Sequence, residues 1–202
     1  MTDSRLRNVG ILIFDEVEVL DFCGPFEVFS IARAPGATGD EGGLFRALTI
    51  AERAETIRCR GGLLVQPHHT VDDHPDLDVL LVPGGQGTRR ERENPRLLRW
   101  IAEQDQRTEI TASVCTGSLL LAAAELLAGH RATTHWAAID LQRTYHPDIE
   151  TVDDERFVDE GHLVTSAGVS AGIDMALHLV ARLHGPDVAG TTARQMEYSW
   201  DG

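Results

Sequence analysis

The chain has 202 residues, 42% of them hydrophobic and 25% charged, which is ordinary for a globular protein and enough for one sizeable core. We therefore expect a single domain over residues 1–202. The 32 acidic and 18 basic side chains give a net charge of −14. This charge repels nucleic acid and anionic membrane surfaces, so we expect neither as a partner.

The N-terminal residues hold only a short apolar run that acids soon follow. We therefore expect no signal peptide, no membrane-spanning segment and a cytoplasmic location. The three cysteines, Cys23, Cys59 and Cys115, are widely spaced and show no CxxC or His/Cys cluster, and three histidines within 67–78 lack the spacing of a ligand set. Free thiols and no metal site are the expectation.

Apolar runs typical of buried strands alternate with helical patterns along most of the chain. The run at 8–14 is continuously apolar, as in a strand covered on both faces, and Asn94 before Pro95 marks a helix start. Expected strands lie at 8–14, 45–51, 77–82, 110–114 and 131–134, hairpins at 56–66 and 157–165, and helices at 26–33, 94–107, 119–127, 135–143, 170–183 and 187–195. This order predicts an α/β three-layer sandwich around a mainly parallel central sheet.

The stretch 109–127 changes from strand-like alternation to an apolar helical run at one residue, Cys115. Free amides and the macrodipole at a helix start favour an anion, so the pattern predicts a thiolate with a pKa lowered to about 3.5–7.5. The small residues at 116–118 would admit a substrate, as at the nucleophile turn of serine hydrolases. Alternatively, Cys115 is only a small buried residue at a crowded turn.

Three loops that follow predicted strands carry reactive or permissive residues: 15–21, 83–87 and 115–117. Ligands of α/β sheets collect beyond the carboxyl ends of the strands, near the topological switch point. We therefore expect these loops to bring together a thiol, at least one carboxylate and a glycine-lined oxyanion pocket.

The segments LLVPGG at 80–85, SVCTGSLLLAAAELLAGHRATTHW at 113–136 and TSAGVSAGIDMALHLV at 165–180 resemble the ThiJ/PfpI family of the class I glutamine amidotransferase-like superfamily. Within it, LDFCGPFEV at 20–28 and the Cys-Thr pair are most similar to isocyanide hydratases, followed by the sensor domains of certain AraC-type regulators. The resemblance runs from about residue 8 to about 198. It implies a flavodoxin-like fold and a homodimer.

By the same resemblance, Cys115 takes the place of the family's nucleophile and Asp21 that of the acid that hydrogen-bonds it. The implied oxyanion or substrate pocket consists of Gly84, Gly85, Thr116, His135 and Gly168. Thr116 stands where peptidases of this family have histidine, which disfavours a protease. Two simpler interpretations stay open, because Asp21 could only cap a helix and His135 could be structural or line the substrate.

The implied reaction is the hydration of an isocyanide, R–NC, to an N-substituted formamide. Cys115 would attack the terminal carbon while Asp21 donates a proton, and Asp21 would then activate water to hydrolyse the thioimidate. No cofactor is needed. Two alternatives remain: a ligand or redox sensor, which would not itself read DNA because no basic helix-turn-helix segment is present, and a glyoxalase-type enzyme acting on 2-oxoaldehydes.

Overall fold

The computed structural model describes residues 5–37 and 42–201. Its centre is a seven-stranded sheet in the order β10-β11-β7-β6-β1-β2-β5, in which only β10 and β11 pair antiparallel. The strands are β1 (Arg7–Leu12), β2 (Phe45–Ala51), β5 (His69–Thr70), β6 (Val79–Val82), β7 (Ile110–Val114), β10 (Phe157–Asp159) and β11 (Leu163–Ser166). The predicted mainly parallel sheet is confirmed.

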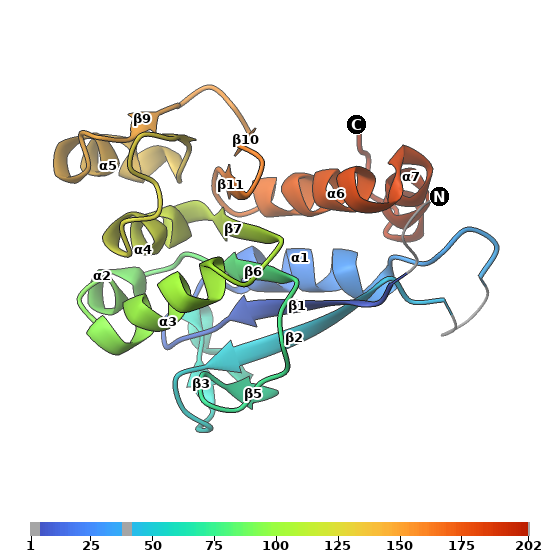
Figure 1. Cartoon of the computed structure of the whole chain (residues 1–202), viewed down its shortest axis with the longest axis horizontal. Coiled ribbons are helices and arrows are strands. Elements are labelled where there is room, and N and C mark those ends of the chain that lie inside the picture. The colour runs from blue at the N-terminus through green and yellow to red at the C-terminus, as the bar shows by residue number, and fades with distance from the viewer. Residues whose placement is uncertain (1–4, 38–41, 202) are drawn as a thin grey trace.

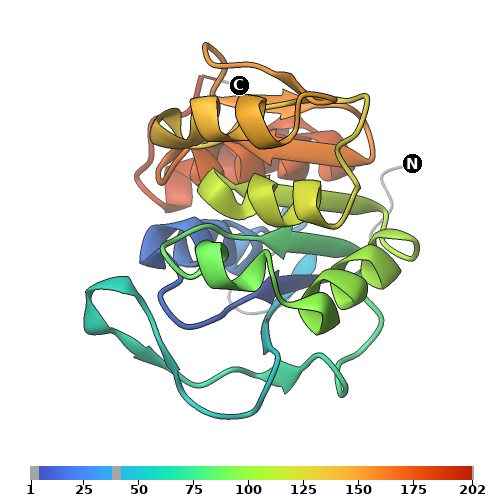
Figure 2. The same cartoon turned by 90° about the vertical axis from the view of Figure 1, so that its left-hand side faces the viewer.

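Helices cover both faces of this sheet and complete the three layers (Figures 1 and 2). On one face α1 packs against α6 and α7, and on the other α4 packs against α2 and α3. Their bounds are α1 (Val19–Ile31), α2 (Thr88–Glu91), α3 (Pro95–Asp105), α4 (Ser118–Ala123), α6 (Ala171–His184) and α7 (Pro186–Gln195). Because both faces are covered, all four residues of β6 are fully buried, which explains their continuous apolar run.

Smaller elements lie outside the main sheet. A hairpin pairs β3 (Ile57–Arg58) with β4 (Leu64–Val65) around the short helix η1 (Arg60–Gly62). β8 (Arg131–Ala132) pairs with β9 (Glu150–Thr151), and η3 (Trp136–Ala138) leads into α5 (Ile139–Tyr145). The segment 131–134 is therefore not a strand of the main sheet.

Two helix boundaries differ from the prediction. α1 begins at Val19, not at 26, and holds Pro25 in its interior, where the proline lacks the N–H that would otherwise bond the Asp21 carbonyl. α4 ends at Ala123, not at 127, because Glu125 adopts a positive φ of 61°. The amides of Glu125 and Leu126 then bond back to the carbonyls of Ala122 and Leu121, the pattern of a Schellman cap.

The helix start at Asn94 is confirmed, since its side chain accepts hydrogen bonds from the amides of Arg96 and Leu97. Within the described residues, no helix combines the length and the apolar character needed to cross a bilayer.

Candidate active site

The loops after β1, β6 and β7 meet at the carboxyl edge of the sheet. The amide of Glu18 donates to the Gly84 carbonyl at 2.9 Å, and Val17 forms an antiparallel bridge with Gly85. From β1 the chain continues to β2 on one side, and the later strands β6 and β7 lie on the other side. The topological switch point of the sheet therefore lies between β1 and β6. The predicted convergence of these loops is therefore present.

Cys115 opens η2 (Cys115–Gly117) directly after β7, with a positive φ of 58°. A non-glycine residue in this region is strained, and the surrounding contacts must hold it there. The Cys115 amide donates to the Ala167 carbonyl at 3.2 Å, and the Cys115 carbonyl accepts from the Thr134 hydroxyl at 3.0 Å. A Cβ on Gly117 would collide with the Val82 carbonyl oxygen, so this tight turn requires glycine.

Asp21 lies in the first turn of α1 and is fully buried. Its Oδ2 accepts a hydrogen bond from the Gly84 amide at 3.0 Å. Within the described residues, no hydrogen bond of standard geometry reaches Oδ1. The carboxyl group lies beside the Cys115 thiol and interacts with it electrostatically. Asp21 therefore faces the thiol rather than capping α1, whose N-cap residue is Glu18.

The two groups have strongly perturbed acidities. Burial raises the pKa of Asp21 from 3.8 to about 7, although the Gly84 amide and the Cys115 thiol partly oppose this. Burial, followed by the charge of Asp21, raises the pKa of Cys115 from 9.0 to about 12. Because the groups interact, the pair loses its protons in two steps, and near neutral pH it holds one proton or two.

The prediction of a lowered pKa for the Cys115 thiol is therefore wrong. The side chain of Cys115 is only 5% exposed, so a thiolate would be poorly solvated. The following helix α4 has six residues and contributes only a short row of aligned peptide dipoles. The Thr116 amide and hydroxyl do favour the thiolate, but burial and the Asp21 carboxylate outweigh them.

Gly84 and Gly85 bring the loop after β6 close to Thr116. A Cβ on Gly84 would lie 2.6 Å from the Thr116 amide nitrogen and 3.0 Å from Oδ2 of Asp21. The Gly85 amide, expected to face the anion pocket, instead donates to the Thr116 hydroxyl at 3.1 Å. In this structure the backbone amide that favours negative charge on the Cys115 sulfur is that of Thr116.

His135 and Gly168 lie against one another, since a Cβ on Gly168 would collide with the His135 ring. Nδ1 of His135 accepts from the Ala137 amide at 3.2 Å, so the neutral ring carries its proton on Nε2. Burial and the positive charge of Arg60 lower the pKa of His135, while Glu18 opposes them. The structure thus places His135 within electrostatic reach of the Arg60–Glu18 ion pair, whose N–O distance is 3.2 Å.

The sequence prediction missed Arg60 and Thr134. Thr134 lies inside the segment 113–136 that carries the resemblance, but a threonine beside a histidine gives no local signal of a role in the site. Arg60 comes from the hairpin 57–65, and only its position before Gly61-Gly62, where the chain turns, hinted at a placement near the site. The described residues contain no group of three or more His, Cys, Asp or Glu arranged to hold a metal. The described cysteines, Cys23, Cys59 and Cys115, are free thiols.

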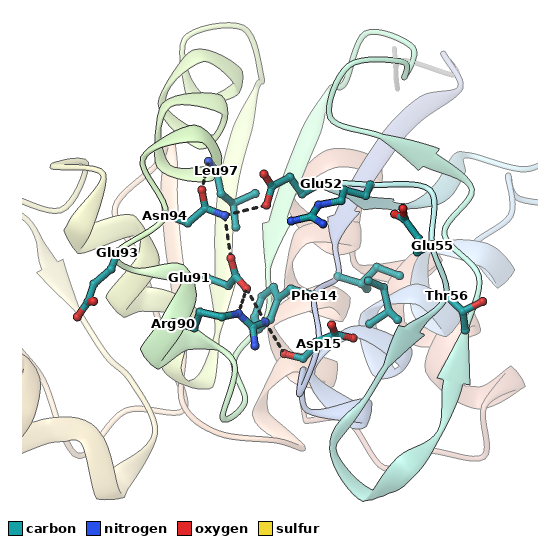
Figure 3. Close-up of a pocket in the computed structure, with 13 residues that line it drawn as sticks. Phe14, Asp15, Glu52, Glu55, Thr56, Arg90, Glu91, Glu93, Asn94 and Leu97 are labelled. Atoms are coloured by element: carbon teal, nitrogen blue, oxygen red, sulfur yellow. Dashed lines mark hydrogen bonds and ion pairs between the residues drawn. The ribbon is translucent and has the colours of Figure 1, made fainter.

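A wide cavity lies away from the thiol. It measures about 580 Å³ and lies over the ends of β1 and β2, opposite the start of α3 (Figure 3). There the side-chain amide of Asn94 donates hydrogen bonds to the carboxylates of Glu91 and Glu52, at 3.0 and 2.8 Å. A smaller cavity of about 240 Å³ contains Thr116, the neighbour of Cys115. Of these two cavities, the smaller one neighbours the candidate site, because Thr116 directly follows Cys115.

An α/β sandwich with a buried acid facing a cysteine at a strand-to-helix turn is the arrangement that the resemblance implied. The chain belongs to the DJ-1/PfpI family, whose model matches residues 7–182. It is 38% identical over 192 residues to isonitrile hydratase of Pseudomonas putida, covering 95% of this chain and 78% of that protein.

Other relatives include a transcription regulator. The chain is 33% identical to the HTH-type transcriptional regulator CdhR of Pseudomonas aeruginosa over 189 residues, which are 94% of this chain but 54% of the regulator. Among solved structures, a ThiJ/PfpI family protein from Pseudomonas syringae matches with a TM-score of 0.84 and 29% identity over 98% of this chain and 77% of that one. Drosophila melanogaster DJ-1beta matches with a TM-score of 0.82 and 18% identity over 97% of this chain and all of that one, which supports the fold alone.

Proposed function

We propose that this protein is a cysteine-dependent isonitrile hydratase that converts R–NC and water to an N-substituted formamide. The observation that carries the proposal is the buried pair of Asp21 and Cys115 at the strand-to-helix turn. The 38% identity to an isonitrile hydratase supports the choice of substrate. We further propose that the protein acts as a cytoplasmic homodimer without a cofactor.

The first half of the reaction forms a covalent thioimidate. In the singly protonated pair, Asp21 takes the thiol proton as the Cys115 sulfur attacks the terminal carbon of R–NC. The carbon gains negative charge as the C–S bond forms, and Asp21 returns the proton to it, giving R–N=CH–S–Cys115. The contact between the Asp21 carboxyl group and the Cys115 thiol supports this role, because the proton moves directly between the two groups.

The second half hydrolyses the thioimidate. Asp21, again a carboxylate, takes a proton from water as the water oxygen attacks the imidate carbon, and delivers a proton to the nitrogen. As the C–S bond breaks, Asp21 takes the proton from the hydroxyl group of the resulting adduct and passes it to the sulfur, which releases R–NH–CHO and restores the thiol. Thr116 would assist through its amide and hydroxyl, which favour negative charge on the departing sulfur. His135 and Gly168 would border the space in which the substrate reacts.

The test is conversion of phenyl isocyanide to formanilide, followed by ultraviolet absorbance. We expect turnover by the native protein and its loss in Cys115→Ala and Asp21→Asn. Cys59→Ala is the control for loss of a buried thiol and Asp153→Asn the control for loss of a carboxylate, and both should retain turnover. A native protein that binds but does not convert isocyanides would contradict the proposal.

A second candidate is a ligand sensor, favoured by the 33% identity to a transcription regulator. The chain covers 54% of that regulator, so the role of the complete regulator is not assigned to this chain. Tight small-molecule binding without turnover would favour sensing. Turnover of methylglyoxal in place of isocyanides would instead favour the glyoxalase-type alternative.

A further inference from the structure

The smaller cavity adjoins the candidate site through a single residue, Thr116. Its hydroxyl accepts a hydrogen bond from the Thr88 hydroxyl at 3.2 Å, and both side chains line the cavity. Thr116 also follows Cys115 directly and interacts with its sulfur through both its amide and its hydroxyl. Thr116 therefore contacts the reacting sulfur and also lines this cavity.

The cavity lies between α2, α4 and the η3–α5 segment, which sit together at one end of the molecule (Figures 1 and 2). Its apolar wall is made by Leu119, Ala137, Ala138 and Leu141. Its volume of about 240 Å³ exceeds the roughly 150 Å³ of an apolar cavity that accepts benzene. One six-membered ring with a small substituent fits this space.

The charges at the cavity are of one sign. Its lining includes two basic residues, Arg89 and Arg92, and no acidic residue. Within the described residues, the Arg89 side chain forms no ion pair, whereas the Arg92 guanidinium pairs with Glu93 at 4.0 Å and lies 5.7 Å from the centre of the Tyr145 ring. In a chain with a net charge of −14, two neighbouring basic residues that share only one distant carboxylate favour an anionic ligand group.

We propose that this cavity binds the substituent R of the isocyanide and selects substrates in which a compact apolar body carries a carboxylate. The ring would pack against Leu119 and Leu141, and the carboxylate would pair with Arg89 and Arg92, whose planar forks suit two-pronged hydrogen bonds. The proposal rests on the proposed hydratase function for the reacting end of the substrate. It adds the chemical class of the substituent R, at the end of the substrate that does not react.

The first test compares 4-isocyanobenzoate with its neutral methyl ester. We expect the native enzyme to favour the carboxylate in kcat/KM by about tenfold, since hydrogen bonds between ionised groups are stronger than those between neutral ones. The double variant Arg89→Gln/Arg92→Gln should lose this preference, mainly through KM, and keep its turnover of the ester. Arg99→Gln, on the exposed face of α3, is the matched control and should keep it.

A second variant tests the wall of the cavity. Leu141 is 37% exposed, so Leu141→Trp adds bulk to the cavity without disturbing the core. We expect it to lower kcat/KM for both aryl isocyanides by about tenfold and to leave methyl isocyanide unaffected, because a methyl group does not reach the cavity. Equal effects on all three substrates would place the substituent elsewhere and overturn the proposal.

A binding measurement separates this proposal from the reaction itself. Titration calorimetry with the Cys115→Ala variant would compare 4-formamidobenzoate with methyl 4-formamidobenzoate, the products expected from the two isocyanides. If the carboxylate binds more tightly and this advantage disappears in Arg89→Gln/Arg92→Gln, the selectivity of the cavity is supported. If the same result is found but no isocyanide is converted, only the hydratase function fails. Turnover of both isocyanides at equal kcat/KM, with equal product binding, overturns the selectivity and leaves the hydratase function standing.

Discussion

The Asp21 carboxyl group and the Cys115 thiol form one acid–base unit in which the carboxylate raises the pKa of the thiol and the thiol lowers that of the carboxyl group. With pKa values of about 7 and about 12, the pair holds a single proton over much of the alkaline range. The protein can therefore keep a nucleophile and its proton together without exposing a free thiolate.

This pairing predicts the pH dependence of turnover. Below the pKa of about 7 both groups are protonated and no base is available for the thiol, whereas above it the singly protonated pair predominates. We expect kcat/KM for phenyl isocyanide to rise with pH through an apparent pKa near 7 and then stay level up to the limit of protein stability. A rate that is flat or falls between pH 6 and 8 would contradict this assignment.

The buried carboxyl group also predicts a pH dependence of stability. Between pH 3.8 and about 7 the folded protein keeps a proton on Asp21 that the unfolded chain has released, so stability falls as the pH rises through this window. The full shift corresponds to about 4 kcal/mol, an upper bound for a buried group. Denaturant unfolding should therefore give a lower free energy of unfolding at pH 8 than at pH 4 for the native protein. This difference should be mostly absent in Asp21→Asn. Equal losses in the two proteins would show that Asp21 titrates normally.

Thiol alkylation isolates the effect of Asp21 on the sulfur. The Asp21 charge contributes to the raised pKa of Cys115, so Asp21→Asn should lower that pKa and speed the reaction of Cys115 with iodoacetamide at pH 8. We expect an acceleration of severalfold, measured by mass spectrometry of the Cys115 peptide. The Cys59 peptide is the internal reference, and slower labelling of Cys115 in the variant would refute the coupling.

A pair of glycine substitutions tests how closely the loop after β6 approaches the site. Gly84→Ala places a methyl group 2.6 Å from the Thr116 amide nitrogen, so we expect a loss of about 1–3 kcal/mol in stability together with a large loss of turnover. Gly190→Ala is the control, because Gly190 lies inside α7 with open space around it. This control should raise stability by roughly 0.5–1 kcal/mol. Normal turnover in Gly84→Ala would mean that the loop is not packed against Thr116.

Much of the fold was predictable because its signals are local. The buried runs at 45–51 and 110–114, the Asn94 cap and the glycine turn of the hairpin at 157–165 each depend on a few neighbouring residues, and all are present. The start of α1 at Val19 has no local signal, because a proline such as Pro25 usually lies in the first turn of a helix, whereas packing of α1 against α6 maintains the helix on both sides of it.

The proximity of several candidate site residues was predictable from the sequence, whereas their pKa values were not. The motifs placed Asp21, Gly84 and Cys115 on loops that the sheet brings together. The thiol pKa was predicted with the wrong sign because its main cause, burial by residues far away in the sequence, leaves no local pattern. The same holds for the cavity at Thr116, whose wall and basic groups come from three separate segments.

The bonds between loops also have a consequence for folding. Asp21 and Gly84 are 63 residues apart, and Gly85 and Thr116 are 31 apart, yet β6 joins both partners because it lies between β1 and β7 in the sheet. Contacts of such long sequence separation form late, after the entropy of closing the intervening loops has been overcome. During refolding the thiol of Cys115 should therefore stay open to labelling until β6 is inserted, so its protection reports the completion of the central sheet.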